Sequence, residues 1–345
     1  MIEIAIEACG MVSSVGLSAP AACAAIRCGL THFSETRFMD SHGQWITGAQ
    51  VPLETPWRGR AKLAHMAALA VREASAGLDE KEIRQTPLVL CLAEPERPGR
   101  FPDQDAHLLA EVQKRVGIQF HPQSMIIANG RVGGVRALEK VQAFLGSGLC
   151  RYCMVAGVDT YLTAKTLGAY EKEQRILTEK NSDGFIPGEA GAAALLTAAR
   201  QSSHAPLAIQ GLGFGQEKAY LGSGHPLRAD GLVQAIKAAL AMAGRDLGDL
   251  DYRLCDLSGE QYYFKEAALA LTRVLRKRKE AFDIQHPAEC IGETGAAIIP
   301  VLLAVASAAI RKGYSKGEGI LCHCANDDGQ RGALVLNAFH REGSS

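Results

Sequence analysis

Short strand-like runs alternate with longer helical patterns along almost the whole chain, and this alternation limits the possible folds more than any other feature. The strand-like runs are residues 3–8, 88–92, 124–128, 153–157, 192–197, 207–212, 252–256, 319–323 and 333–339. The helical patterns, with apolar residues three and four positions apart, are residues 20–28, 61–76, 104–116, 133–145, 232–243, 261–276 and 295–311. This order predicts an α/β protein whose crossover helices form two layers.

A polar, serine-rich break at residues 199–203 divides the chain. Each side contains a strand, a long helix, a further strand and a buried helix of small residues, which suggests internal duplication. We therefore predict two halves, residues 1–200 and 204–345.

The composition excludes several classes of protein. The chain has 345 residues, 47% of them hydrophobic, and its 37 basic and 37 acidic residues give a formal net charge of zero. A large core is therefore possible, and there is no charge surplus that would indicate nucleic-acid binding. Residues 1–6 lack the features of a signal peptide, and no uninterrupted apolar run reaches transmembrane length. We predict a cytoplasmic protein that binds neither nucleic acid nor membrane.

Ten cysteines, mostly in apolar segments, indicate buried thiols in a reducing compartment. Two clusters, Cys150–Cys153 and Cys322–Cys324, could in principle supply four zinc ligands. The first cluster, however, lies between a predicted helix and strand, whereas redox C-x-x-C pairs normally begin a helix. The second lies within a predicted strand. We predict buried packing for both clusters, with no metal and no cofactor.

Residues 126–138, IIANGRVGGVRAL, predict a buried strand that breaks at Asn129–Gly130 and continues as a helix. Enzymes present nucleophiles in this geometry, because a helix N-terminus stabilises negative charge or a thiolate. Asn129 can cap the helix, and Gly130, Gly133 and Gly134 allow another backbone or a ligand to approach closely. Arg131, however, stands where a Cys or Ser would be expected.

Several segments in this order resemble the β-ketoacyl synthases. They are IEACGMVSSVG near the start, the segment NGRVGGVRAL, SDGFIPGEAGAAALL, DLSGEQYYFKEAAL and CIGETGAAIIPVLLAV. The resemblance covers residues 2–338 and implies the thiolase-like fold, in which two duplicated α/β halves with mixed sheets form five αβαβα layers. In this family the segment SDGFIPGEAG, with Asp183, Gly188 and Glu189, is mainly structural, although Asp183 and Glu189 could also be interpreted as an acid/base pair.

The resemblance also implies where catalytic groups should lie. Condensing members use a Cys that attacks the acyl thioester and two His that stabilise developing oxyanions. The Cys position falls on Arg131, with Gly130 as the alternative shifted by one residue, and the His positions fall on Ser258 and Glu293, the latter next to Gly292. The family's lysine falls on Ala288, and residues 325–329 replace its Gly-Phe-Gly-Gly loop. Every reacting group is therefore absent at its matched position.

The replacing residues suggest a decayed site. Arg131 stays protonated and cannot attack a thioester. Glu293 could act as a base and Ser258 as a weak nucleophile, but no His lies between them as a relay. We expect an ion pair between Arg131 and Glu293 that fills the former pocket. The alternatives are a pocket in which Arg131 binds an anion, or a different reaction.

Three further signals are weaker. Gly211-Leu-Gly-Phe-Gly215 imitates part of a dinucleotide-binding motif, but its third glycine comes too early and no helix follows. Residues 273–279 are basic, which suits a solvated helix end or the docking of an acidic carrier protein. The proline-rich residues 95–102 suit a surface loop or a partner contact.

The resemblance implies a homodimer in which the strand after the nucleophile helix, residues 153–158, pairs with its two-fold mate, although a central strand would have the same apolar character. The missing groups favour a non-catalytic interaction protein, such as an adaptor or chaperone for a type VI secretion effector. The alternative is an acyltransferase, or a subunit like the chain-length factors that pair with active ketosynthases. The expected partner is therefore effector cargo, a carrier protein or a ketosynthase.

Overall fold

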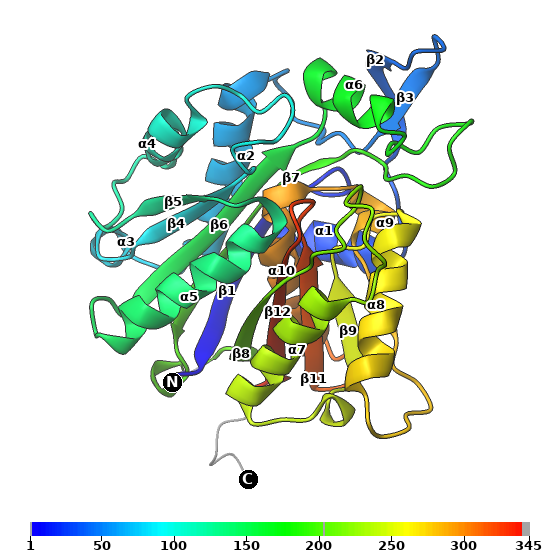
Figure 1. Cartoon of the computed structure of the whole chain (residues 1–345). Helices are drawn as coiled ribbons and strands as arrows, with labels where there is room; N and C mark the ends of the chain where they lie inside the picture. Colours follow the sequence, from blue (N-terminus) through cyan, green and yellow to red (C-terminus); the bar gives the residue numbers. More distant parts are fainter. Residues whose placement is uncertain (1, 203, 340–345) are drawn as a thin grey trace.

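The computed structural model describes residues 2–202 and 204–339, and it consists of two α/β halves joined side by side (Figure 1). The strands of the N-terminal half are β1 (Ile4–Val12), β4 (Leu88–Leu92), β5 (Met125–Ala128), β6 (Tyr152–Thr160) and β7 (Glu189–Ala198). The strands of the C-terminal half are β8 (Leu207–Gln216), β9 (Tyr252–Cys255), β10 (Ile284–Gln285), β11 (Gly319–Ala325) and β12 (Gln330–Ala338). Met1, Ser203 and residues 340–345, which belong to the predicted halves or to the break between them, lie outside the described residues.

Both halves have the same sheet topology. The N-terminal strands lie in the order β5-β4-β6-β7-β1 and the C-terminal strands in the order β10-β9-β11-β12-β8, so each half is ordered 3-2-4-5-1 in its own chain sequence. In each half the three strands farthest from the junction are parallel and the next ladder is antiparallel. The halves meet where β1 pairs with β8 at Ile4–Ile209 and Ala5–Ala208. The predicted duplicated α/β fold with mixed sheets is confirmed.

Helices form the other three of the five layers. The larger ones are α1 (Ala19–Arg27), α2 (Gly59–Ala74), α4 (Gln104–Val116), α5 (Gly133–Gly146), α7 (Asp230–Ala243), α8 (Gln261–Val274) and α10 (Ile298–Arg311). Helices α2 and α4 cover the outer face of the N-terminal sheet, and α7 and α8 cover that of the C-terminal sheet. Helices α5 and α10 lie between the two sheets. Helix α10 is apolar on almost its whole circumference because both sheets and neighbouring helices surround it.

Several short elements are not evident from the sequence pattern. They are the hairpin β2 (Ser34–Met39) and β3 (Trp45–Gly48) and the helices α3 (Glu80–Arg84), α6 (Ala164–Lys172) and α9 (Ala288–Ile291). Helix α3 has five residues and depends on a capping box between Asp79 and Glu82 rather than on a long apolar stripe. Elements of one or two turns carry too little periodicity to be predicted.

The prediction that residues 153–158 form the interface strand of a dimer was wrong. Strand β6, which contains residues 153–158, pairs with β4 on one side and β7 on the other. Both of its hydrogen-bonding edges are therefore occupied within one chain, and it cannot pair with a two-fold mate. The edge strands of the sheet are β5 and β10.

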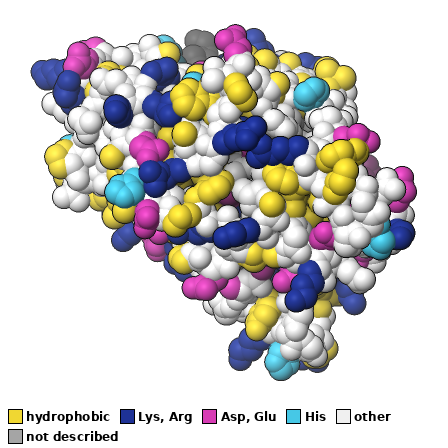
Figure 2. Space-filling model, turned by 90° about the horizontal axis from the view of Figure 1, so that it is seen from above, with side chains coloured by type: hydrophobic (Ala, Val, Ile, Leu, Met, Phe, Trp, Pro, Cys, Tyr) yellow, Lys and Arg dark blue, Asp and Glu magenta, His cyan; other side chains and the backbone are white. Residues whose placement is uncertain are grey.

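Charges of both signs are mixed over the surface. On the face seen in Figure 2, basic, acidic and hydrophobic side chains lie among one another, in keeping with the formal net charge of zero. Within the described part of the chain, no helix is both long and apolar enough to cross a bilayer.

The glycines of β8 have a packing role that accounts for the weak dinucleotide-like motif. Helix α7 lies so close to β8 that a Cβ atom at Gly213 would overlap the carbonyl oxygen of Ala235, and Gly211 and Gly215 meet the same helix in the same way. The motif therefore serves sheet–helix packing.

We expect Gly213→Ala to destabilise the protein by about 1–3 kcal/mol, because the new methyl group forces α7 away from β8. Gly168→Ala is the matched control, since a Cβ there, within α6, meets no atom within 4 Å. The control should stabilise the protein by about 0.5–1 kcal/mol. Urea unfolding of both variants tests this, and equal effects would contradict the packing argument.

Candidate functional site

The site begins at the turn between β5 and α5. Gly130 follows the strand with a φ of +54°, and a 3₁₀ turn over Gly130–Val132 precedes α5. This left-handed conformation favours glycine. A side chain at this position would overlap a carboxylate oxygen of Glu94, which follows β4. The Glu94 carboxylate therefore occupies the space that a side chain at residue 130 would need.

The prediction that the Asn129 side chain caps the helix was wrong. Its side chain instead donates from Nδ2 to Oε1 of Gln330 at 3.1 Å. The Val132 N–H donates to Oδ1 of Asn326, also at 3.1 Å, and Nδ2 of Asn326 donates to the carbonyl oxygen of Asn129. The loop between β11 and β12 thus supplies the capping group and ties the C-terminal half to the turn.

Glycines let the two central helices meet at this turn. A Cβ at Gly134 would overlap the side chain of Ile299 in α10, whereas Gly133 has only ordinary contacts. The close approach predicted from the glycines is therefore confirmed at Gly134.

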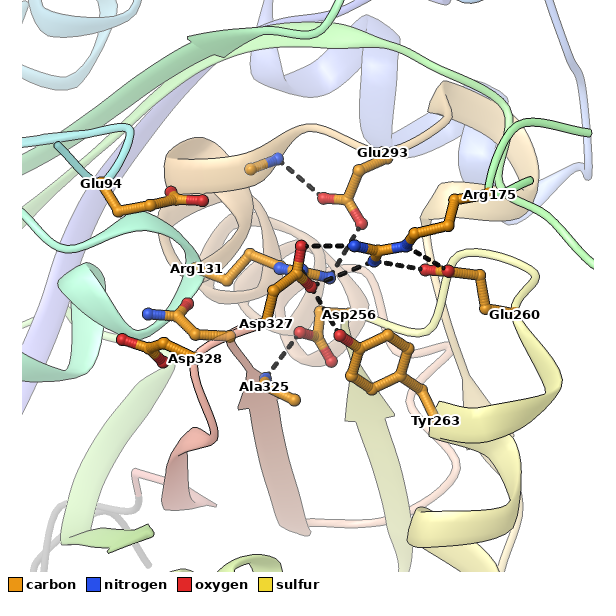
Figure 3. Close-up of polar contacts among 12 residues, drawn as sticks. Glu94, Arg131, Arg175, Asp256, Glu260, Tyr263, Glu293, Ala325, Asp327 and Asp328 are labelled. Atoms are coloured by element: carbon orange, nitrogen blue, oxygen red, sulfur yellow. Dashed lines mark hydrogen bonds and ion pairs between the residues drawn. The ribbon is translucent and has the colours of Figure 1, made fainter. Parts of the chain in front are cut away.

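Arg131 points into the protein and forms the expected ion pair (Figure 3). Its Nη1 lies 3.3 Å from Oε2 of Glu293, and both residues are buried, at 5% and 3% exposure. A second ion pair joins its Nη2 to Oδ1 of Asp327. Burial alone would lower the pKa of Arg131, but Asp327 and Glu293 outweigh it and hold that pKa well above its ordinary value. The guanidinium therefore stays charged and is paired with two carboxylates.

Asp327 links Arg131 to a second arginine. Nη1 of Arg175 lies 2.7 Å from its Oδ2, and the hydroxyl of Tyr263 donates to its Oδ1 at 2.6 Å. Arg175 also holds Glu260 in a bidentate pair, at 2.7 and 3.0 Å. Burial works to raise the pKa of Asp327, but the two arginines and the Tyr263 hydroxyl hold it well below its usual range. We call Arg131, Arg175, Glu260, Tyr263, Glu293 and Asp327 the central ion cluster.

Asp256, at the end of β9, lies beside this cluster. Its Oδ2 accepts the Ala325 N–H at 2.8 Å, and it is 5% exposed. Burial raises the pKa of Asp256 to about 7, because the attraction of Arg131 and this hydrogen bond only partly offset the loss of solvent. The carboxyl group therefore titrates near neutral pH without being paired to a base.

The proline-rich loop is anchored by a buried arginine. Arg97 is 5% exposed and makes a bidentate pair with Glu94 at 2.8 and 2.9 Å. Its Nη2 also lies 3.4 Å from Asp159, and its guanidinium lies 4.1 Å from the ring centroid of Tyr161. The loop thus places Glu94 against Gly130 and is more than the surface loop expected from its composition.

Asp183 and Glu189 contact different parts of the scaffold. Asp183 is exposed and accepts the Gln261 N–H at the start of α8. Glu189 is buried, accepts hydrogen bonds from the Val51 N–H and the Thr160 hydroxyl, and pairs with Lys62. These contacts are structural and do not bring the two carboxylates together as an acid/base pair.

Gly188 and Gly292 lie where the loop before β7 crosses the turn before α10. A Cβ at Gly188 would overlap the carbonyl oxygen of Ile291, and Gly292 has a φ of +69°. Both glycines therefore fix the position of Glu293, whose backbone carbonyl accepts the Gly188 N–H at 3.0 Å.

The two cysteine clusters are too far apart to share a metal ion. Cys153 lies in β6 and Cys322 and Cys324 in β11, with β7, β1, β8 and β12 between those strands. Burial lowers the pKa of His323, also in β11, to about 3, so this imidazole stays neutral.

Comparisons with known proteins identify the architecture. No family model and no curated protein matches the sequence. Among solved structures, an ishigamide ketosynthase/chain length factor matches with a TM-score of 0.81 at 15% identity, covering 98% of this chain and all of the other. The chain has the thiolase-like ketosynthase fold.

Two further ketosynthase structures match over the same length. One is the AntDE:AntF complex, an acyl-carrier protein of a type II polyketide synthase with its ketosynthase, at a TM-score of 0.83, 15% identity, and 98% and 100% coverage. The other is the ketosynthase ApeO with its chain length factor ApeC from Xenorhabdus doucetiae, at 0.77, 14% identity, and 98% coverage of both chains. All three likenesses concern the fold.

Within this ketosynthase fold, the central ion cluster brings together only two of the three residues matched to catalytic groups. Arg131 and Glu293 are in contact, whereas Ser258 is half-buried and, within the described residues, makes no side-chain hydrogen bond to the cluster. In the part of the chain that the structure describes, no histidine forms a hydrogen bond to the central ion cluster either. Four members of the cluster were not predicted from the sequence, namely Arg175, Glu260, Tyr263 and Asp327. The sequence held one indication that this loop contributes charged groups, because residues 326–328 are Asn-Asp-Asp where the family has a glycine-rich loop.

We expect Arg131→Met to destabilise the protein by roughly 3–5 kcal/mol, because it leaves the buried Glu293 carboxylate without its partner. Arg84→Met is the control, since Arg84 forms an exposed pair with Glu80 one helical turn away and should lose about 0.3–0.5 kcal/mol. Urea unfolding at pH 7 measures the loss of unfolding free energy in each variant. A loss at Arg131 no larger than that at Arg84 would contradict the buried-cluster account.

Asp256 makes a testable contribution to the pH dependence of stability. Its folded pKa of about 7 exceeds the unfolded value of about 3.9, so the folded state binds the extra proton and stability falls as the pH rises between these values. Asp256→Asn removes this titration. The difference in unfolding free energy, variant minus wild type, should rise by on the order of 4 kcal/mol from pH 4 to pH 7. A flat difference over this range would refute the pKa assignment.

Proposed function

We propose that this ketosynthase-fold chain does not catalyse condensation and acts by binding a protein partner, as an adaptor or chaperone. The observation that carries the proposal is the central ion cluster, which includes Arg131 and Glu293, the positions matched to the catalytic Cys and one catalytic His. Neither Gly130 nor Arg131 has an attacking group, so the choice between these two matched positions does not alter the conclusion.

The electrostatics of the cluster support this. A condensing enzyme needs hydrogen-bond donors directed at a developing oxyanion. Here the donors of Arg131 and Arg175 are directed at Glu293, Asp327 and Glu260, all within one chain. Glu293 is a carboxylate at a position matched to an oxyanion-stabilising His, and a carboxylate there would repel a developing negative charge. With its donors paired in this way, the cluster opposes acyl transfer.

A chain-length-factor-like subunit is the second candidate. It is supported by the similar solved structures, two of which are described as a ketosynthase with a chain length factor. In this version the partner is an active ketosynthase, and a carrier protein is bound by the pair. In the adaptor version the partner is effector cargo, such as a type VI secretion effector, and the chain is a cytoplasmic homodimer.

Strand β5 is the pairing edge that we propose for either dimer. It forms a ladder with β4 on one side, and its opposite edge ends the sheet. All four of its residues are half-buried. Two such edges related by a two-fold axis can form one continuous sheet across the interface.

The oligomeric state of the purified chain, determined from its mass in solution, distinguishes the adaptor version from the chain-length-factor version. The adaptor version predicts that the chain purified alone is a homodimer by light scattering and retains unrelated cargo in a pull-down from native cells. The chain-length-factor version predicts that it needs a co-expressed ketosynthase to stay soluble and then forms a heterodimer. A stable monomer that retains neither kind of partner would overturn the proposed function.

A further inference from the structure

A cavity lined by α1 and by several elements of the C-terminal half lies away from the central ion cluster. It has a volume of about 470 Å³ and lies beside the edge strand β10, between α1, α10 and the start of α9. Strand β10 has only two residues, and α10 presents the small Ala309 here, so the sheet and helix leave space between them. The volume is in the range of small-molecule sites.

The inner wall of the cavity is apolar. Leu254 of β9 and Val305 and Ala309 of α10 line it and are 1%, 7% and 5% exposed, and Ile26 and Ile284 extend the wall toward the mouth. Such a wall suits a hydrocarbon chain or a ring, whose transfer from water is favourable.

Both basic and acidic side chains line the cavity. The basic side chains are Arg27 and Lys316, the carboxylate is Glu289, and His286 also lines the cavity. Lys316 is paired with Asp283. Arg27 has no ion-pair partner among residues 2–202 and 204–339.

Arg27 is exposed and contacts an aromatic ring. Its guanidinium lies 4.2 Å from the ring centroid of Tyr314, so the side chain is stacked without any carboxylate using its N–H groups. A planar guanidinium stacked in this way is suited to a bidentate carboxylate, and less of its conformational freedom is lost on binding.

We propose that this cavity binds a small amphipathic carboxylate, with its apolar body against Leu254 and Val305 and its carboxylate on Arg27. The proposal is independent of the function inferred for the central ion cluster, because no residue of that cluster lines the cavity. An alkylamine with an apolar body of the same length is positively charged. Arg27 and Lys316 would repel it, so it should not bind.

Octanoate, 1-octanol and octylamine are the probes, and ligand-observed NMR titration of the full chain is the measurement. Octanoate should bind saturably with a Kd on the order of 1 mM or tighter. Octanol should bind more weakly, and octylamine should not bind. Absence of saturable octanoate binding up to about tenfold above that Kd, or octylamine binding as tightly as octanoate, overturns the proposal.

Variants localise the site. Arg27→Gln should weaken octanoate binding about 10- to 100-fold, the range expected for losing a charged hydrogen-bonding partner, and leave octanol binding unchanged. Arg311→Gln, which removes an exposed arginine from the last turn of the neighbouring α10, is the matched control and should change neither. Ala309→Trp should fill the cavity and abolish binding of both ligands, with circular dichroism reporting the fold. Unchanged octanoate binding in Arg27→Gln, or in folded Ala309→Trp, contradicts the assignment.

Discussion

The pairing of the buried Arg131 guanidinium is the interaction on which the rest of the site depends. A charged group removed from water must be paired and hydrogen-bonded, and breaking such a pair costs several kcal/mol. Arg131 meets this requirement with Glu293 from the turn before α10 and Asp327 from the loop between β11 and β12. One side chain from the N-terminal half thus fixes two loops of the C-terminal half.

The scaffold around this pair depends on packing contacts that do not require any catalytic group. The turn after β5, the contact between Gly134 and Ile299 and the crossing at Gly188 and Gly292 are needed for packing. Glu94, held by Arg97, occupies the position where a side chain at residue 130 would lie. The turn after β5 is therefore surrounded by buried acidic and basic side chains that pair with one another.

The sequence predicts the architecture better than the site. Long periodic segments such as residues 104–116 and 133–145 correspond to α4 and α5 because their apolar stripes are buried against the sheets. The Arg131–Glu293 pair was predictable, since the family resemblance matches both residues to catalytic groups of one pocket. Arg175 and Glu260 were not, because they are distant in sequence and only tertiary packing brings them to Asp327. Strand β6 was misplaced because an apolar strand has the same composition at an edge and in the centre.

The central claim is that this fold carries no condensing chemistry, and intact-mass spectrometry after incubation with acyl and malonyl thioesters tests it most directly, with carbon dioxide release measured in parallel. The account predicts an unmodified chain and no decarboxylation above the rate without protein. A covalent acyl adduct, or turnover that is abolished by Glu293→Gln, would contradict it.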